Sequence, residues 1–460
     1  MQSGRSPMSH SHIPHPAPRL LLMTGALLLA AVWFAGGVTV DVTATDEVLV
    51  LLSLPVLAIA AWQWLHAPSP PPVVRAALAA AALVVLVPVL QLLLPVAGGA
   101  AREAISADLA AAGMPAVATG SLTPQATEHA VWSLLPPLAL FLGCALLDHR
   151  QRRRAVQVAL GLVLANLLFG FFQAGLAHNH PLRLFENNGT GFGGALINGN
   201  HQASALVIGM LLALGLAADA RRRREGEGRN RRQYAWLVAA AVCFVCIPLA
   251  GSTAGMVIGV LFLAAGVLGT GLVDVSRSSR TGRFVLAGAA VVGVLAIAVV
   301  SQWADLAQTD PLRHAAATET WALGNRFLPL GSGVGSFVQI FAQAAGPLFQ
   351  RAEYVNHAHN EYAQWWLEGG LLALVAVLAV LATLGWIGQR LLRDRRHRPL
   401  GVACWLGLCA LLLHSVVDFP LRTLSLMSMA GVLAGLALAE ARRTRERLTP
   451  LHANDAPQQA

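Results

Sequence analysis

Long, uninterrupted apolar runs constrain this chain more than any other feature of its sequence. About twelve stretches are long enough to cross a bilayer as helices. They lie near residues 20–38, 48–66, 74–97, 131–147, 155–176, 201–218, 234–250, 254–273, 284–302, 362–387, 401–417 and 423–440. The runs are continuous rather than alternating, which favours helices, because a helix satisfies its backbone hydrogen bonds within its own segment. The sequence therefore predicts an all-α, polytopic integral membrane protein with about twelve transmembrane helices.

Composition agrees with a membrane protein and argues against a soluble one. Hydrophobic residues make up 56% of the 460 residues and charged residues only 12%, too few to cover the surface of a soluble domain of this length. The five cysteines all lie inside apolar runs, where packing is their expected role, and they imply no disulfide framework.

The arginines predict the orientation of the helices. All 32 basic residues are arginine, and a cytoplasmic N-terminus puts all but six of them on the cytoplasmic side, including the clusters "DHRQRRR", "RRRREGEGRNRR" and "RLLRDRRHR". The net charge of +9 thus reflects membrane topology, and nucleic acid is not expected as a partner. We expect a transmembrane domain over 20–440, with cytoplasmic tails at 1–19 and 441–460.

Polar residues concentrate in the loops that this orientation places outside. These loops are 39–47, 98–130, 177–200, 251–253, 303–361 and 418–422; the largest, 303–361, is long enough for a small folded cap. By contrast, Glu368 is the one acid or arginine well inside a predicted span, since Arg75 and Glu440 stand at the ends of theirs. Ion-coupled transporters usually keep ionisable groups near mid-membrane, so the pattern favours an enzyme that acts on a lipid-linked substrate at the outer face. A transporter or flippase for a lipid-linked glycan remains the alternative.

The stretch "YVNHAHNEYAQWWLEGG", 354–370, gathers His357, His359, Asn360 and Glu361 just before an apolar run. A helix N-terminus there favours anions and disfavours an additional cation, so it would attract an anionic group and help to keep His359 neutral. Asn360 and Glu361 are expected either to cap the helix and orient His359 or to serve in capping alone. A metal site made of the two histidines and Glu361 is a weaker alternative, because no second cluster of ligands accompanies it.

Other outer segments carry weaker signals. In "NGNHQA", Asn200 and His201 fit either a sugar-binding surface or a loop that ends in a helix cap. The alternating glycines of "LGSGVGSF" fit either a structural turn or a diphosphate contact. "HSVVDFPLR", 414–422, places His414, Asp418 and Arg422 at the same face as His359.

Six arginines lie in the predicted outer loops, although arginine is generally enriched in cytoplasmic loops, and this exception suggests a function for some of them. They are Arg102, Arg183, Arg313, Arg326, Arg351 and Arg422. A guanidinium group matches phosphate oxygens in a bidentate fashion, so several of these side chains could hold a diphosphate. Surface solvation is the expected role of Arg102 and Arg351.

Over roughly 185–425 the chain resembles the O-antigen ligase and polymerase superfamily of bacterial membrane glycosyltransferases. The resemblance rests on His359 and Asn360 followed after nine residues by Gly370, on "FLPLGSGVGSF", on "NGNHQA" and on "HSVVDFPLR". Two positions depart from the family pattern: Ala373 replaces a Gly, Thr or Tyr, and Thr253 stands where the family commonly has Arg.

The resemblance implies a metal-independent enzyme, without a cofactor, in the bacterial inner membrane with its active site facing the periplasm. It would transfer a glycan from undecaprenyl diphosphate to a hydroxyl acceptor, which is lipid A–core for a ligase, the growing polysaccharide for a polymerase, or protein for an O-oligosaccharyltransferase. These members are not separated, although the absence of an appended soluble domain favours a ligase or polymerase. His359 would be the base and Arg313 with Arg422 would hold the diphosphate. Arg422 or Arg183 would compensate for Thr253, and further substrate contacts would come from His357, Asn360, Glu361, Asn200 and His201.

Overall fold

The computed structural model describes residues 17–37, 44–95, 100–111, 113, 118–177, 179–184, 192–223, 231–273, 311–349, 355–395 and 398–442. The predicted span 284–302 lies outside these residues, as does most of both predicted tails. Within the described residues the secondary structure is helical and contains no strand, so the all-α prediction is confirmed for them.

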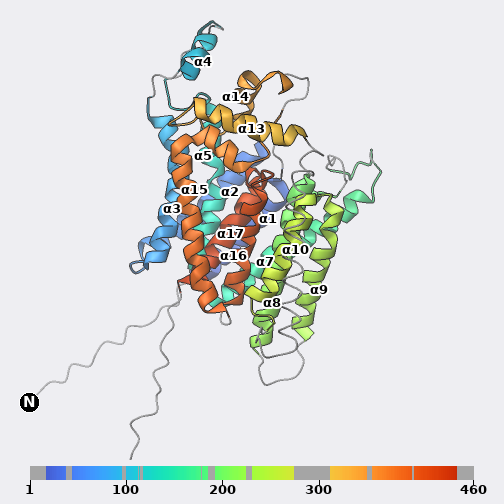
Figure 1. The fold of residues 1–460 in the computed structure, drawn as a ribbon. Helices are drawn as coiled ribbons and strands as arrows, with labels where there is room; N and C mark the ends of the chain where they lie inside the picture. The colour runs from blue at the N-terminus through green and yellow to red at the C-terminus, as the bar shows by residue number, and fades with distance from the viewer. Residues whose placement is uncertain are drawn as a thin grey trace, which may run out of the picture.

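The helices run largely parallel to one another as a bundle, with shorter helices gathered over one end (Figure 1). Their bounds are α1 Ala17–Ala35, α2 Ala44–Leu65, α3 Pro72–Leu93, α4 Ala100–Ala111, α5 Pro124–Ser133, α6 Leu135–Leu146, α7 His149–Ala174, α8 Gly199–Arg222, α9 Arg231–Cys246, α10 Thr253–Gly269, α13 Pro311–Arg326, α14 Phe337–Ala344, α15 Glu361–Arg393, α16 Pro399–His414 and α17 Leu424–Ala441. Short 3-10 helices are η1 Gly194–Leu196, η2 Pro248–Ala250, η4 Pro347–Phe349 and η6 Pro420–Arg422.

Eight helical segments among the described residues are long and apolar enough to cross a membrane. They are α2, α3, α5 with α6, α7, α8, α9 with η2, α15 and α17. Three shorter apolar helices, α1, α10 and α16, coincide with further predicted spans. The chain is therefore a helical membrane protein with several spans, while the total of twelve stays a prediction.

Helix α8 forms the centre of one half of the bundle and is buried along its whole apolar length. It packs against α7, α9, α10 and α16. Small residues permit this close approach: a Cβ added at Gly215 would lie 2.6 Å from the Cβ of Ala403 on α16. Because the helix is enclosed by protein on all sides, its first turn can carry polar side chains into the interior of the molecule.

One end of the bundle is held by arginines that pair with buried acids. Arg152 contacts the Glu440 carboxylate at 2.9 Å, and Arg153 contacts the Asp219 carboxylate at 3.3 Å. The Arg398 guanidinium also donates to the backbone carbonyl of Glu440 at 2.9 Å. These contacts join the arginine-rich ends of α7, α8, α16 and α17, which the charge pattern assigned to one side of the membrane.

The opposite end carries a cap made of α13, α14 and the loop around Ser121, above which α4 projects (Figure 1). Arg102 is buried and donates to the carbonyl of Gly331 at 2.8 Å, and Leu122 N donates to the carbonyl of Ser332 at 2.8 Å. The expectation of a solvated Arg102 is therefore wrong, because its guanidinium fastens one loop of the cap to another. Arg351 lies outside the described residues, and Arg326 lies exposed at the end of α13.

The glycine-rich loop of the cap packs against a break in α15. Gly370 interrupts the helix with φ 55° and ψ −138°, and a Cβ there would collide with the carbonyl oxygen of Pro329. Gly331 N donates to Phe327 O, and Gly333 N donates to the carbonyl of Glu368, each within 2.9 Å. Since these N–H groups are used inside the protein, the loop is a structural turn and does not present them to a diphosphate.

Candidate functional site

His359 occupies a constrained position directly before α15. Asn360 is the N-cap of that helix, and its side-chain oxygen accepts a hydrogen bond from Ala363 N at 3.0 Å. The backbone of His359 has φ 50°, a left-handed conformation that is uncommon for a residue other than glycine. The Asn360 helix cap and the left-handed backbone of His359 therefore fix the position and direction of the His359 side chain.

Asp418 is the partner that orients this imidazole. Its Oδ1 lies 3.3 Å from His359 Nδ1 and accepts a second hydrogen bond from Phe419 N at 2.9 Å. Burial raises the pKa of Asp418, but the hydrogen bond from His359 and the nearby imidazoles lower it further, so that it ends below its ordinary value. An ionised Asp418 holds the proton of His359 on Nδ1 and leaves Nε2 as the atom that can accept another proton.

Three imidazoles surround the ring of Phe419. The ring centroids of His357, His359 and His201 lie 4.2, 4.9 and 5.2 Å from its centroid. His201 reaches this place from the first turn of α8, and it is completely buried. The structure thus brings together three histidines from two segments that are far apart in the sequence.

His357 is held as a neutral ring. Burial, assisted by the positive charge of Arg422 and opposed by a hydrogen bond with Gln364, lowers the pKa of His357 to about 3. The Gln364 side chain lies 3.3 Å from His357 Nδ1 and also donates to the Glu368 carboxylate at 3.1 Å. His357 therefore adds no charge to the site at neutral pH, and it can contribute only a hydrogen bond or a packing surface.

The guanidinium of Arg422 is paired mainly with carboxylates of the protein itself. Its Nε lies 3.3 Å from a Glu361 carboxylate oxygen, and its Nη1 donates to Glu368 at 2.8 Å. Burial lowers the pKa of Arg422, whereas the two carboxylates raise it more, so the guanidinium stays charged. Nη2 is buried and has no hydrogen-bond partner among the described residues. Arg422 and Glu361 thus tie η6 to α15, and one guanidinium nitrogen remains for a ligand.

The remaining predicted binding residues lie apart from this cluster. Asn200 sits in the first turn of α8, where the side chain of Asn198 accepts a hydrogen bond from its N–H and caps the helix. Arg183 donates to the carbonyl of Leu176 near the end of α7. Arg313 lies exposed in the first turn of α13, outside the set of side chains that surround Phe419. Among the described residues, no group of three or more metal-ligating side chains has a geometry suited to a metal ion.

An apolar groove leads through the bundle to the polar cluster. It has a volume of about 340 Å³ and runs between α3, α6, α15, α16 and α17. Apolar side chains such as Val84, Val380 and Leu411 line most of its length, whereas Glu361, Tyr362 and Ser415 stand at one end. That end is two residues along the chain from His359, because Glu361 is the first residue of α15 and follows His359 and Asn360. The groove therefore joins a lipid-like interior to a polar, titratable surface.

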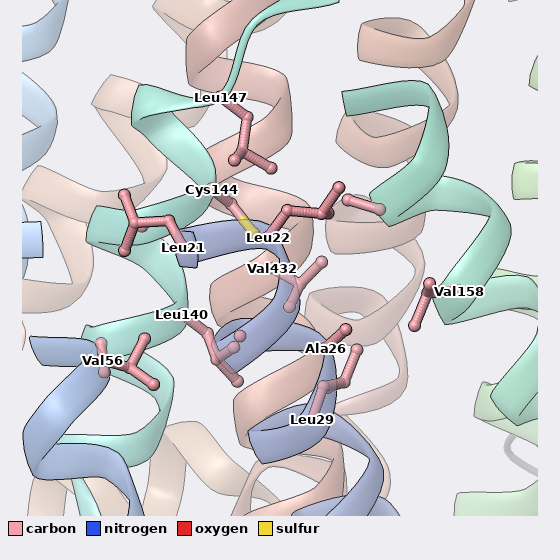
Figure 2. Close-up of a pocket in the computed structure, with 14 residues that line it drawn as sticks. Leu21, Leu22, Ala26, Leu29, Val56, Leu140, Cys144, Leu147, Val158 and Val432 are labelled. Atoms are coloured by element: carbon pink, nitrogen blue, oxygen red, sulfur yellow. The ribbon is translucent and has the colours of Figure 1, made fainter. Parts of the chain in front are cut away.

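A second, much smaller cavity of about 20 Å³ lies between α1, α2, α6, α7 and α17 (Figure 2). Its lining is apolar apart from the thiol of Cys144, and the labelled side chains around it are mostly leucines and valines. With no polar group to orient a ligand, this cavity is a packing defect rather than a second candidate site.

Sequence reasoning placed Asp418 at the outer face and Glu368 inside a predicted span, but assigned neither of them to the site. The available signal was the spacing of His414 and Asp418, four residues apart at the end of an apolar run that leads to a turn. Sequence alone does not reveal that Asp418 pairs with His359 or that Glu368 pairs with Arg422, because both contacts join segments that only the packed bundle brings together. Comparison of the chain with known protein families and with curated proteins finds no match.

Proposed function

We propose that this protein transfers a glycan from undecaprenyl diphosphate to a hydroxyl acceptor at the capped end of the bundle, without a metal. The observation that carries the proposal is the hydrogen-bonded pair of His359 and Asp418 beside the polar end of an apolar groove. A long isoprenoid chain suits the groove by its chemistry, and its diphosphate would then lie among the polar side chains next to His359.

The chemistry assigned to His359 is general-base catalysis. Nε2 takes the proton of the acceptor hydroxyl while the hydroxyl oxygen forms a bond to the anomeric carbon of the glycan. The bond from that carbon to the diphosphate breaks, and the diphosphate leaves with the electron pair. Asp418 stabilises the imidazolium that results, as an oriented carboxylate does in other His-dependent enzymes.

Charge on the leaving diphosphate needs a cation, and the cluster offers one guanidinium nitrogen of Arg422. Arg313 at the start of α13 is the predicted second source of positive charge, and it would have to approach the groove from the cap. The proposal includes the bacterial inner membrane as the location and the periplasm as the side that the cap faces. The acceptor is lipid A–core if the protein is a ligase and the growing polysaccharide if it is a polymerase. It is a protein if the chain is an O-oligosaccharyltransferase.

A transporter for a lipid-linked glycan is the second candidate, because the apolar groove would serve a carried isoprenoid chain equally well. The two functions differ in what they require of His359. Transfer needs a base at this position, whereas translocation needs only a path for the polar head group.

The test compares transfer and translocation in lipid nanodiscs and vesicles that contain the purified protein and labelled undecaprenyl-diphosphate glycan. His359→Asn is the informative variant, because asparagine tolerates the left-handed backbone found there. Loss of a general base should slow transfer by about 10²-fold or more. His314→Gln, at an exposed histidine of the same cap, is the matched control and should retain activity. Undiminished transfer by His359→Asn, or translocation without any transfer by the unmodified protein, would refute the proposal.

A further inference from the structure

Several polar atoms deep in the capped end of the bundle have no hydrogen-bond partner among the described protein residues. They include both ring nitrogens of His201, Nε2 of His414 and Oδ2 of Asp418. The three residues are 0%, 1% and 1% exposed, so bulk water does not reach them. Buried polar groups are nearly always hydrogen-bonded, and an unpaired carboxylate oxygen is especially costly. Four such atoms in one region therefore point to a ligand of small size.

The protein geometry explains why these groups do not pair directly. His201 stands edge-on to Phe419, with 88° between the ring planes, and His414 already uses Nδ1 in a 2.6 Å hydrogen bond with Ser204. Asp418 interacts electrostatically with both histidines, yet it binds neither through Oδ2. The imidazoles of His201 and His414 and Oδ2 of Asp418 are thus buried in the same region, but they are too far apart to form direct hydrogen bonds with one another.

We propose that ordered water molecules bind between Asp418, His201 and His414, and that these waters keep Asp418 fixed as the anion that orients His359. Water is the ligand whose chemistry fits, because one molecule can both donate to a carboxylate and accept from an imidazole N–H, and buried waters typically join two to four such polar groups. The role assigned to the waters rests on the proposed function, whereas their presence does not. His201 and His414 are then positioning residues, since they act on His359 through water and Asp418.

Charges around the region agree with neutral water rather than with an ion. The segments packed there carry the following polar side chains: His201 and Ser204 from α8, His414 from α16, His357 and His359 from the segment before α15, Glu361 and Glu368 from α15, and Arg422 from η6. Arg422 is paired with both glutamates, and His357 is neutral at ordinary pH, so Asp418 is the charge that most needs additional donors. Water molecules hydrogen-bonded to the imidazoles supply those donors.

Synchrotron hydroxyl-radical footprinting tests the waters directly, because radicals form in place from bound water and oxidise the side chains beside it. The readout is the oxidation rate of Phe419, which is 3% exposed, against that of Phe341, which is 2% exposed and packs among Phe337 and Phe349. We expect Phe419 to be oxidised several-fold faster than Phe341. His201→Phe, which removes both ring nitrogens and keeps an aromatic ring, should bring the two rates together. Equal, low rates in the unmodified protein would overturn the proposal.

The pH dependence of glycan transfer tests the role of the waters. An imidazolium that loses its anionic partner gives up its proton more readily, so His201→Phe should move the acidic limb of the pH–rate profile down by about one pH unit. Thr127→Val removes an equally buried hydroxyl in the cap, bonded to Ser121 and Val334, and should leave the limb in place. A limb unmoved by His201→Phe would refute the positioning role. If the unmodified protein shows no transfer, the proposed function fails, and footprinting alone decides whether the waters are present.

Discussion

Gly370 offers the sharpest test of how the fold builds the site, because it breaks α15 two residues after Glu368, one of the two carboxylates that hold Arg422. The substitution Gly370→Ala keeps the side chain as small as possible while it adds a Cβ. At φ 55° and ψ −138° the backbone is in a region that only glycine adopts without strain, and the cost for another residue is about 1–3 kcal/mol. The new Cβ would also overlap the carbonyl oxygen of Pro329 and approach Gly331 N to 2.7 Å.

Forced overlap in a packed interior adds about 1–3 kcal/mol, so the two effects together destabilise the protein by about 2–6 kcal/mol. For a chain of 460 residues, where 1 kcal/mol is worth about 1 °C, we expect the midpoint of thermal unfolding to fall by about 2–6 °C. Tryptophan fluorescence of detergent-solubilised protein would measure the midpoint, since Trp365 and Trp366 lie close to the break.

Gly385→Ala is the matched control on the same helix. A Cβ at Gly385 meets nothing within 4 Å, and the residue has an ordinary helical conformation, so the substitution should be neutral or slightly stabilising. If Gly370→Ala unfolds within about 1 °C of Gly385→Ala, the break in α15 does not hold the cap to the bundle and the reasoning fails.

Three further predictions concern charge and orientation. Arg422→Met should lower the free energy of unfolding by about 3–5 kcal/mol, because it leaves the buried carboxylates of Glu361 and Glu368 without their cation. Replacing both carboxylates by amides in the same chain should recover most of the loss. An unchanged thermal midpoint in Arg422→Met would contradict the pairing. His357 is neutral in the folded protein down to about pH 3 but takes up a proton in the unfolded chain below pH 6.5, so the thermal midpoint should fall as pH drops from 6.5 toward 4. His357→Phe should make that fall smaller. Equal slopes of midpoint against pH in the variant and the unmodified protein would exclude His357 as a cause. In intact cells stripped of the outer membrane, an impermeant maleimide should label Gln343→Cys on α14 and spare Ser69→Cys between α2 and α3; the reverse pattern would place the cap in the cytoplasm and refute the proposed orientation.

The predicted spans that fall within the described residues matched helices, because a long apolar run is a local property of the sequence. The Asn198 and Asn360 caps are local in the same sense, since each side chain bonds a backbone N–H two or three residues further along. Break points were not predicted. The segment expected as a span at 131–147 begins earlier, at Pro124, and is divided at Leu134 into α5 and α6.

The electrostatics of the site depend on contacts that the sequence does not contain. Arg422 was expected to face a diphosphate, but Glu361 and Glu368 occupy most of its donors. Glu361 was expected to bind substrate or to cap α15, and it instead accepts a hydrogen bond from Leu421 N at 2.7 Å besides contacting Arg422. Such pairings join residues more than fifty positions apart, and only the packing of α15 against α16 and η6 decides them.

The enclosed position of α8 has a consequence for biogenesis. This helix is surrounded by α7, α9, α10 and α16, and the last of these is synthesised long after α8 has entered the bilayer. The growing chain must therefore leave one flank of α8 against lipid until its C-terminal quarter emerges from the ribosome. His201, which ends up beside Phe419, has no aromatic neighbour from that quarter during this interval. The side chains around Phe419 consequently come together only at the end of translation, so a truncated product would insert into the membrane without this cluster.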